Sequence, residues 1–460
     1  MPAHITSLFI FRRDLRLHDN TGLNEALRLS EKVIPCFIFD PRQIEPHAYQ
    51  SKPGLRFMLQ SIDDLEQQLI TAGGKLALYH AAHQEVITQL FVQQQIEAVF
   101  INRDYTPFSC LRDAEIADVC SQLGIALHVL PDALLTEPEL AVKSDRTPYK
   151  VFTAFYNNAR KFPVAVPQAF EKRNFLNVAT VFAADQIKVS CAPTMVIMPG
   201  GRQQALSILN HLGNYQDYAH DRDHPFQNAT SRLSAHIKFG TCSIREVYYA
   251  IVEQLGSEHP LLRQLYWRDF FTHIADHFPR VFGHAFIEKF DHLEWDNRPD
   301  YFQAWCEGKT GFPIVDAGMR ELNTTGFMHN RVRMITASFL VKDLHIDWRW
   351  GERYFAQHLV DYDPCVNNGN WQWAASTGCD AQPYFRIFNP WLQQQKFDPL
   401  CRYSYRWVPE LKKLTVNIIH RWDKKQVECS YPAPIIDHGR ESRITKERYK
   451  KAVSSRTPVN

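Results

Sequence analysis

Residues 361–391 read DYDPCVNNGNWQWAASTGCDAQPYFRIFNPW, and this stretch lies in the half of the chain that contains every tryptophan. All ten tryptophans fall between Trp267 and Trp422, and the first 266 residues contain none. This asymmetry indicates that the 460 residues form two differently built halves. At roughly 100–200 residues per domain, a chain of this length predicts about two to four domains.

The first half alternates short apolar runs with amphipathic stretches. Asn20 is typical of the N-cap of a helix, here one that extends to Leu29, and residues 55–70 predict another helix. Such alternation predicts an α/β domain with a doubly wound parallel sheet, which binds ligands beyond the carboxyl ends of its strands. The sequence contains neither GxGxxG nor GxxxxGKS/T, so the common nucleotide-binding motifs are absent. The predicted strands are residues 7–11, 33–40, 75–79, 98–102 and 126–130.

A stretch interrupted by prolines, from Val164 to Gly201, predicts a long surface linker between the halves. The pattern after it is helical, and Ser243-Ile-Arg-Glu246 is a capping box that opens one helix. Further helices are expected at residues 312–323, 329–344 and 350–359. We therefore expect an α/β domain over residues 1–135, a linker over 136–202 and an all-α domain over 203–460.

Composition restricts the function further. The 52 Lys and Arg against 50 Asp and Glu give a net charge of +2, so any nucleic-acid site must be a local basic patch. The last forty residues carry ten Lys or Arg and five Asp or Glu, which predicts a solvated basic tail; a weak DNA-contacting arm is the alternative.

Cysteine usage and apolar patterning predict the compartment. The ten cysteines include no CxxC pair, which argues against a disulfide framework or a metal site and favours a reducing cytosol. The first residues lack the charge order of a signal peptide, and no apolar run reaches eighteen residues. We expect a cytoplasmic protein with no membrane partner and no metal.

Two short stretches contain residue types suited to ligand binding. Residues 229–234, ATSRLS, place three hydroxyls and a guanidinium before a helical segment, which suits a diphosphate, although a capping turn has the same composition. Residues 264–271, QLYWRDFF, join a tryptophan to an arginine that could stack on and clamp a base, or form a core aromatic beside a surface arginine.

Together with FIFRRDLRLHDNTGL at residues 9–23, MHNRVRM at 328–334 and the run 361–391, these stretches resemble the photolyase/cryptochrome family. The resemblance extends from about Leu8 to Leu411 and is closest to the class I cyclobutane pyrimidine dimer photolyases. It implies an all-helical domain that binds FAD, whose reduced anion is excited by light and passes an electron to a dimer flipped out of UV-damaged DNA. The ring splits and the electron returns. The family implies a monomer.

The resemblance also implies roles for individual residues. Asn367 matches the position that faces flavin nitrogen 5, where a neutral amide suits a reduced anionic flavin and some cryptochromes carry Asp or Cys. Arg333 matches the basic partner of Asp361, and Asp363 matches a second carboxylate near the flavin. The residues that match the family's FAD-phosphate contacts are Tyr218, Thr230, Ser231, Arg232, Leu233 and Ser234.

Trp295, Trp348 and Trp371 match the family's electron-transfer chain, which carries electrons from the surface to oxidised flavin. Without the resemblance, each would be interpreted as a core aromatic residue. Trp267 and Trp373 match the walls of the pocket for the flipped dimer, where flat rings replace duplex stacking.

Three further pocket positions concern substrate choice. Asn330 and Met334 stand where photolyases for the (6-4) photoproduct have histidines, which favours the cyclobutane dimer. Gln264 departs from the usual Glu of dimer photolyases: it can hydrogen-bond but cannot share a proton. We expect dimer binding to be kept and repair yield to be somewhat lowered, and (6-4) repair stays a minor alternative because that branch has Gln.

Arg222 and Arg331 match family contacts to DNA phosphates, and Arg386 and Lys396 are weaker candidates, since plain solvated charge explains them equally well. A second, antenna chromophore is expected in the first domain. Folate-binding members have Asn-Glu where this chain has Phe108-Ser109, and the preceding Thr-Pro run resembles deazaflavin-type members. A folate, a deazaflavin, a flavin or an empty pocket all stay open.

Three other functions are alternatives to dimer repair. A cryptochrome would sense blue light without repair. DASH cryptochromes match less well at MHNRVRM and NNGNWQWAAST. A generic flavin-dependent redox enzyme would turn over in the dark, and the missing dinucleotide motif argues against it.

Overall fold

In this computed structural model the described residues are 2–179, 182–187, 195, 197–227, 229–425 and 427–454. The first part of the chain forms a sheet whose strands are all parallel, in the order β3-β2-β1-β4-β5. The predicted doubly wound α/β domain is therefore confirmed. The strands are β1 (His4–Phe11), β2 (Ser30–Phe39), β3 (Ala77–His80), β4 (Ala98–Asn102) and β5 (Ala126–Leu130).

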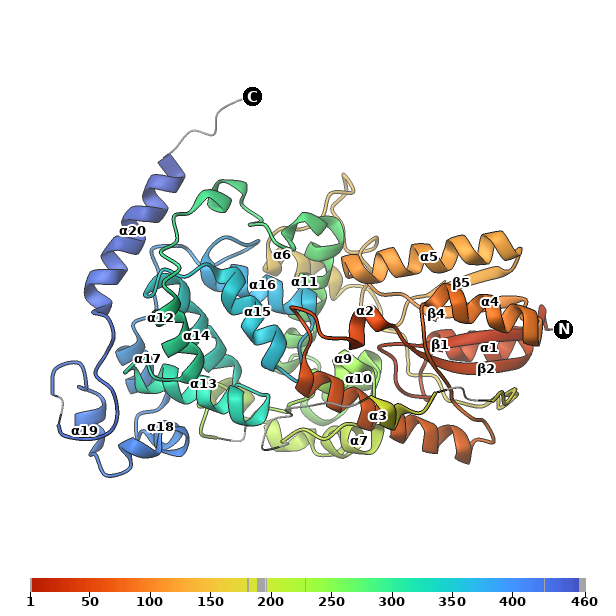
Figure 1. Cartoon of the computed structure of the whole chain (residues 1–460), viewed down its shortest axis with the longest axis horizontal. Coiled ribbons are helices and arrows are strands. Elements are labelled where there is room, and N and C mark those ends of the chain that lie inside the picture. The colour runs from red at the N-terminus through yellow and green to blue at the C-terminus, as the bar shows by residue number, and fades with distance from the viewer. Residues whose placement is uncertain are drawn as a thin grey trace.

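Helices cover both faces of this sheet, as Figure 1 shows. Phe9 and Phe11 of β1 pack in the same buried cluster as α1 (Thr21–Leu29) and α3 (Lys52–Thr71). The alternate residues of β1, Leu8 and Ile10, pack with α4 (His83–Gln94) and α5 (Pro107–Leu123). Successive side chains of a strand point to opposite faces, which is why a strand covered on both sides is apolar throughout.

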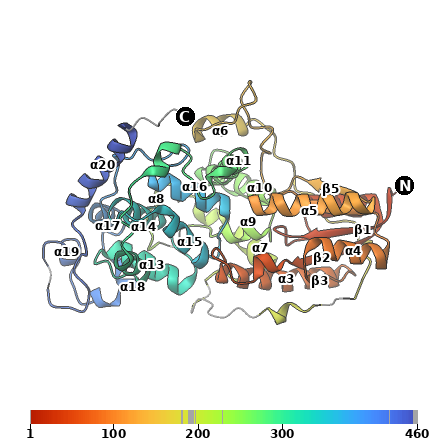
Figure 2. The ribbon, with the colours of Figure 1, turned by 45° about the horizontal axis from the view of Figure 1, so that its top comes forward.

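The rest of the chain is helical (Figures 1 and 2). The capping box predicted at Ser243 is present and opens α10. The helices are α2 (Pro41–Ile44), α6 (Phe152–Ala159), α7 (Arg202–Asn210), α8 (Tyr218–Asp221), α9 (Ser234–Phe239), α10 (Ile244–Leu255), α11 (Pro260–His277), α12 (Pro299–Glu307), α13 (Pro313–Thr325), α14 (Asn330–Lys342), α15 (Trp348–His358), α16 (Pro364–Ala375), α17 (Pro390–Phe397), α18 (Arg402–Trp407), α19 (Val416–Ile419) and α20 (His438–Ser454).

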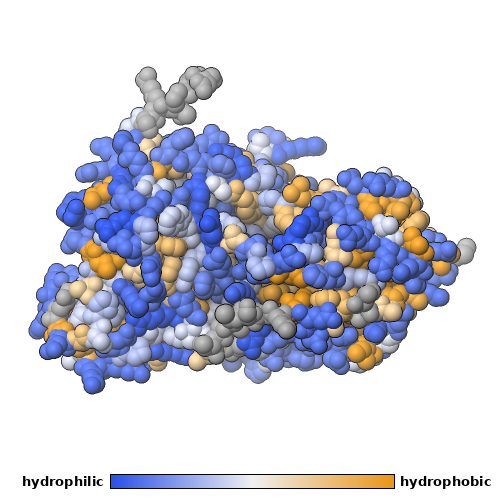
Figure 3. Space-filling view, viewed as in Figure 1, coloured by the Kyte–Doolittle hydropathy of each residue, from blue (hydrophilic) through white to orange (hydrophobic). Residues whose placement is uncertain are grey.

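Short 3-10 turns connect several of these helices, at Ala184–Gln186, Leu212–Tyr215, Pro279–Val281, Glu288–His292 and Pro409–Leu411. Among the helices that the structure describes, none combines the length and the apolar character that a membrane span needs. On the face drawn in Figure 3, hydrophobic side chains gather mainly over the α/β domain, whereas the helical domain is mostly hydrophilic.

The segment predicted as a linker is partly ordered against both domains. Its helix α6 packs on α11, and Asn174 and Leu176 form backbone hydrogen bonds with Val33 of β2. One of the prolines that suggested the linker, Pro193, lies outside the described residues.

The expectation of a solvated tail is wrong for residues 438–454. They form α20, whose Thr445 and Tyr449 are buried one helical turn apart. The Tyr449 hydroxyl donates to the carbonyl of Ala375 (2.5 Å), and the Lys342 ammonium lies 3.7 Å from the Tyr449 ring. A charge count overlooks this packing because the basic residues occupy the solvent side of the same helix.

A buried charge network joins the two domains. Arg16 of the first domain donates to both oxygens of Asp132 (2.8 and 2.7 Å), and Arg245 of α10 donates to Asp132 (2.8 Å) and to Asp19 (2.9 Å). Burial alone would raise the pKa of Asp132, but Arg16 and Arg245 lower it to about 2, so the carboxylate is charged at neutral pH.

We predict that Asp132→Ala destabilises the protein strongly, because it leaves Arg16 and Arg245 buried without their shared carboxylate. Loss of one member of a buried ion pair costs about 3–5 kcal/mol. Urea unfolding followed by far-UV circular dichroism measures this loss. Glu25→Ala breaks the exposed pair with Arg28 and is the matched control, expected to leave the unfolding midpoint almost unchanged. Equal midpoints for the two variants would refute the role of the network.

Candidate active site

A polar junction in the helical domain brings together three predicted residues. Arg333 of α14 forms an ion pair with Asp361 (3.0 Å), and the Ser234 hydroxyl, at the start of α9, donates to the same carboxylate oxygen (2.6 Å). Asp361 follows α15, so the junction joins segments that are more than a hundred residues apart. The arrangement agrees with the predicted pairing of Arg333 with Asp361.

This junction contains buried polar atoms that have no partner among the described residues. They are the second oxygen of Asp361, Nε of Arg232 and Nε2 of His329. Arg232 adopts a left-handed backbone conformation (φ 56°), which is uncommon outside glycine, and its guanidinium lies 5.4 Å from the Phe327 ring. Buried donors and acceptors are normally satisfied. A bound polar group with anionic and hydrogen-bonding parts would satisfy these atoms, which fits a flavin dinucleotide.

The other predicted phosphate-contact residues surround the same region. Thr230 and Ser231, shortly before α9, are partly exposed, and Leu233, the N-cap of that helix, is buried. Tyr218, at the start of α8, is buried, and Arg222 lies over its ring at 5.6 Å.

Asp363 serves as the N-cap of α16. Its Oδ1 accepts hydrogen bonds from the backbone N–H groups of Cys365 (3.0 Å) and Val366 (3.2 Å), and its Oδ2 accepts from the Arg13 guanidinium. Burial opposes the charge of this carboxylate, but Arg13, Arg268 and the hydrogen bond from the Val366 N–H together hold the pKa of Asp363 below its usual value. The residue therefore anchors α16 to the α/β domain as an anion.

Asn367 lies one turn further along α16 and is buried. Its Nδ2 donates to the backbone carbonyl of Glu352 (3.1 Å), so the amide is held in one orientation. The Glu352 carboxyl accepts from Asn368 (3.0 Å), and burial raises the pKa of Glu352 to about 7. Sequence reasoning missed Glu352 because a Glu on a helix is usually exposed, and only its neighbours reveal its burial.

The three tryptophans predicted for electron transfer share one hydrophobic cluster. Trp371 and Trp348 are buried in it, and the half-buried Trp295 packs against it. The indole N–H groups of Trp348 and Trp295 have no hydrogen-bond partner among the described residues. Gly351 of α15 permits the position of Trp371, because a Cβ at residue 351 would lie 2.1 Å from the indole ring. Gly351 was not identified from the sequence.

The residues predicted for the lesion pocket lie on α11, α14 and α16, and the first two helices each pack against α16. Gln264 and Trp267 are one turn apart on α11, and Trp373 is near the end of α16; all three are partly exposed. Phe152 stacks on the Trp267 indole at 3.6 Å with the planes 6° apart, which supports one face of that ring.

Asn330 and Met334 occupy neighbouring turns at the start of α14. The Asn330 amide lies 3.8 Å from the Met334 sulfur, so the two side chains touch. Asn330 is exposed and Met334 partly so. Neither can act as a general acid or base.

The residues predicted to contact phosphates differ in whether a carboxylate already pairs with them. Arg331 forms an ion pair with Asp223 (2.6 Å) and lies over Phe397 at 4.5 Å. Lys396 also lies over Phe397, at 5.1 Å, and is exposed, as is Arg386. Arg331 and Lys396 therefore share one surface, although Asp223 offsets part of the charge of Arg331.

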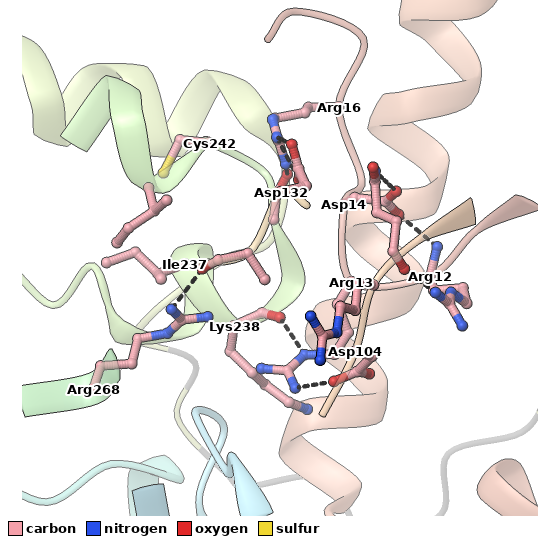
Figure 4. A pocket seen from close by; sticks show the side chains of 15 residues that line it. Arg12, Arg13, Asp14, Arg16, Asp104, Asp132, Ile237, Lys238, Cys242 and Arg268 are labelled. Atoms are coloured by element: carbon pink, nitrogen blue, oxygen red, sulfur yellow. Dashed lines mark hydrogen bonds and ion pairs between the residues drawn. The ribbon is translucent and has the colours of Figure 1, made fainter. Parts of the chain in front are cut away.

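A narrow cleft, open to solvent, lies between the two domains at the carboxyl ends of β1 and β4. Figure 4 shows Arg13 inside it, donating to the Lys238 carbonyl (3.1 Å) and to Asp104 (3.1 Å). Burial, reinforced by Arg13, lowers the pKa of Lys238 to about 7. Since the strand order reverses between β1 and β4, this is the place where doubly wound sheets bind ligands.

Arg13, Asp104 and Lys238 were not among the predicted site residues. Only the domain contact reveals them, because Arg13 follows β1, Asp104 follows β4 and Lys238 is in α9, and the three meet through folding. The described residues contain no group of three or more His, Cys, Asp or Glu side chains that could hold a metal ion.

Comparisons with known proteins agree with this geometry. Residues 7–172 match the family model described as DNA photolyase, and residues 261–451 match that described as the FAD binding domain of DNA photolyase. A deoxyribodipyrimidine photo-lyase of Alkalihalophilus pseudofirmus is 37% identical over 94% of this chain and 95% of its own.

Solved structures of photolyases are also similar to this chain in sequence and fold. An archaeal photolyase from Sulfolobus tokodaii, solved with two FAD molecules, is 44% identical with a TM-score of 0.89, covering 97% of this chain and 100% of the other. A class III photolyase from Agrobacterium tumefaciens is 32% identical with a TM-score of 0.90, covering 98% of each chain. This chain therefore belongs to the DNA photolyase family, and its helical part is an FAD-binding domain of that family.

Proposed function

We propose that this protein repairs cyclobutane pyrimidine dimers in DNA by a light-driven reaction. The observation that carries the proposal is the packing of α11, α14 and α16. The half-buried Trp373 shares α16 with Asn367. The helix of the half-buried Trp267, α11, and the helix of Arg333, α14, each pack against α16. A pocket for an extruded base and a flavin site thus share the same three helices.

FAD, when bound, supplies the light-excited electron donor that allows the cyclobutane ring to split. The residues that would hold it are Arg232, Ser234, Arg333, Asp361 and Asn367, together with Tyr218, Thr230, Ser231, Leu233 and Asp363. The Asn367 amide, fixed by the Glu352 carbonyl, presents its oxygen without adding charge. The ion pair with Arg333 and the hydrogen bond from Ser234 hold the Asp361 carboxylate in position beside the proposed FAD site.

The lesion pocket favours the cyclobutane dimer over the (6-4) photoproduct. Trp267 and Trp373 offer flat faces that replace the base stacking lost on extrusion. Phe152 stacks on one face of the Trp267 ring and holds it in place. Asn330 and Met334 can contact bases but cannot transfer protons, which (6-4) repair by histidines would require. Gln264 favours the (6-4) branch as a second candidate function, since it replaces the usual Glu.

The cleft at the carboxyl ends of β1 and β4 is the place we propose for an antenna chromophore. Five arginines and Lys238 outnumber Asp14, Asp104 and Asp132 in its lining, and this net basic lining suits an anionic folate, deazaflavin or flavin. The two FAD molecules of the Sulfolobus relative make a flavin a reasonable first compound to test.

We also propose the domain division 1–135, 136–202 and 203–460, with a monomeric enzyme acting in the cytoplasm. The resemblance to the family supports the monomer. Arg222, Arg331, Arg386 and Lys396 are proposed to contact phosphates, with Arg331 leaving Asp223 to pair with a DNA phosphate on binding.

The direct test uses FAD-loaded, photoreduced protein and an oligonucleotide with one thymine dimer, under blue light and in darkness. We expect restored thymines only in the light. Photoreduction without repair of this substrate would overturn the proposal, and the same assay with a (6-4) oligonucleotide would then separate the second candidate from a photoreceptor.

Trp371→Phe should slow the photoreduction of oxidised FAD while enzyme reduced chemically beforehand repairs normally, because Phe is much harder to oxidise than Trp. Flavin absorbance during illumination measures the first effect. Trp305→Phe is the matched control, since Trp305 is equally buried and its ring lies 6.3 Å from that of Trp371. Loss of all repair by the prereduced Trp371→Phe enzyme, or equal slowing in both variants, would contradict the assignment.

Trp267→Ala should weaken binding of dimer-containing DNA by about 1–3 kcal/mol, the usual value of one base stack. Fluorescence anisotropy with a labelled duplex measures the affinity. Trp407→Ala, at a half-buried indole on α18, controls for general loss of an aromatic residue and should bind normally. An unchanged affinity for Trp267→Ala would remove this residue from the pocket.

Gln264→Glu should raise the quantum yield of dimer repair and leave affinity almost unchanged, because the carboxyl group can share a proton with the reduced dimer whereas the amide can only hydrogen-bond. The yield is measured from thymine absorbance per photon absorbed. Gln264→Ala is expected to lower both yield and affinity. A lower yield for Gln264→Glu than for the natural protein would show that Gln is an adaptation to another lesion.

A further inference from the structure

A basic hairpin projects beside the proposed lesion pocket and has no role in the assignments above. Val142 and Pro148 form an antiparallel bridge, and the turn between them carries Lys143 and Arg146, both exposed. Figure 2 shows the chain before α6 rising away from the body of the molecule at this point.

The turn is held in shape by its own hydrogen bonds. The backbone N–H of Lys143 donates to the Thr147 carbonyl (2.9 Å), and that of Arg146 donates to the Lys143 carbonyl (2.9 Å). Asp145, the only acidic residue in the turn, accepts from the N–H (2.9 Å) and the hydroxyl (2.6 Å) of Thr147. The hydrogen bonds from Thr147, with a smaller contribution from Lys143, lower the pKa of Asp145, so the carboxylate stays charged. The exposed turn therefore carries two cations and one anion in a preformed arrangement.

The base of the hairpin is anchored to both walls of the pocket. Phe152, which follows it, stacks on Trp267 at 3.6 Å and donates its N–H to Asp380 (3.0 Å). The thiol of Cys379 donates to the Lys150 carbonyl (2.9 Å). Asp380 and Cys379 belong to the loop after α16, whose Gln382 is hydrogen-bonded to the backbone of Trp373. A few contacts thus link the hairpin to both indoles.

Two more cations extend this surface. Lys150 is exposed beside the Phe278 ring (5.2 Å), and Arg263 of α11 is exposed over Phe152 (5.1 Å), one residue before Gln264. We name Lys143, Arg146, Lys150 and Arg263 the hairpin bank. Among the described residues, none of the four forms an ion pair with a carboxylate.

We propose that the hairpin bank binds the phosphate backbone of duplex DNA on the Trp267 side of the lesion. This inference rests on the proposed function. Two exposed cations on the turn, with Lys150 and Arg263 beside it, outnumber the single carboxylate of Asp145 and match a polyanion. Phosphate contacts position a duplex without reading its sequence. The bank is separate from Arg331, whose charge Asp223 partly offsets, so the protein holds the duplex with two distinct basic surfaces.

The test uses the double variant Lys143→Gln/Arg146→Gln in the full, FAD-loaded, reduced protein. Affinity for a dimer-containing duplex is measured by anisotropy over a range of salt concentrations, in darkness. Loss of two phosphate contacts should reduce the slope of log K against log salt by about 2 and weaken binding roughly tenfold at low salt, for damaged and undamaged duplexes alike. Circular dichroism and flavin content check that the variant folds.

Lys32→Gln/Lys75→Gln is the matched control, because it removes two exposed charges near the other end of the sheet. It should keep the affinity and slope of the natural protein. Unchanged binding by the hairpin variant, or an equal change in the control, would overturn the inference while leaving dimer repair intact. If the natural protein neither prefers damaged duplex nor repairs it in light, the proposed function itself fails.

Discussion

The carboxylate of Asp363 fixes the start of α16 and joins it to the other domain. One oxygen caps the helix through two backbone N–H groups, and the other accepts from Arg13, which follows β1. Asn367, Trp371 and Trp373 all belong to α16, so the flavin contact, the innermost indole and one pocket wall depend on this single anchor. Because the carboxylate is buried, it would be costly without Arg13, and the paired charge links the two domains at the site.

Close helix packing then sets the distances around that anchor. A Cβ at Gly369 of α16 would lie 2.1 Å from the Phe271 ring of α11, and one at Gly351 of α15 would be equally close to Trp371. These two glycines let three helices approach more closely than larger residues would allow. As a result, the helix that carries Trp267 lies close to the helix that carries Trp373 and Asn367.

Much of the architecture could be predicted locally. The five strands, the Asn20 cap, the Ser243 capping box and the helices around residues 313–325 and 330–342 all lie where apolar periodicity and capping residues indicated. The docking of α20 and the burial of Glu352 could not be predicted in this way, since both depend on what packs against one helix face. The net positive charge of the last forty residues does not indicate that one face of α20 is buried, because only Thr445 and Tyr449 form that face.

The sequence by itself determined the fold class and the family, because strand and helix periodicity and the runs around residues 230, 267 and 361–391 are local properties of the chain. It also named most residues of the candidate site through that resemblance. Only the tertiary structure decided which charges meet. Arg13 and Asp363 are 350 positions apart, and Arg331 finds Asp223 rather than standing free. Ion pairs of this kind depend on distances of a few ångströms between separate elements, and no periodicity along the chain encodes such distances.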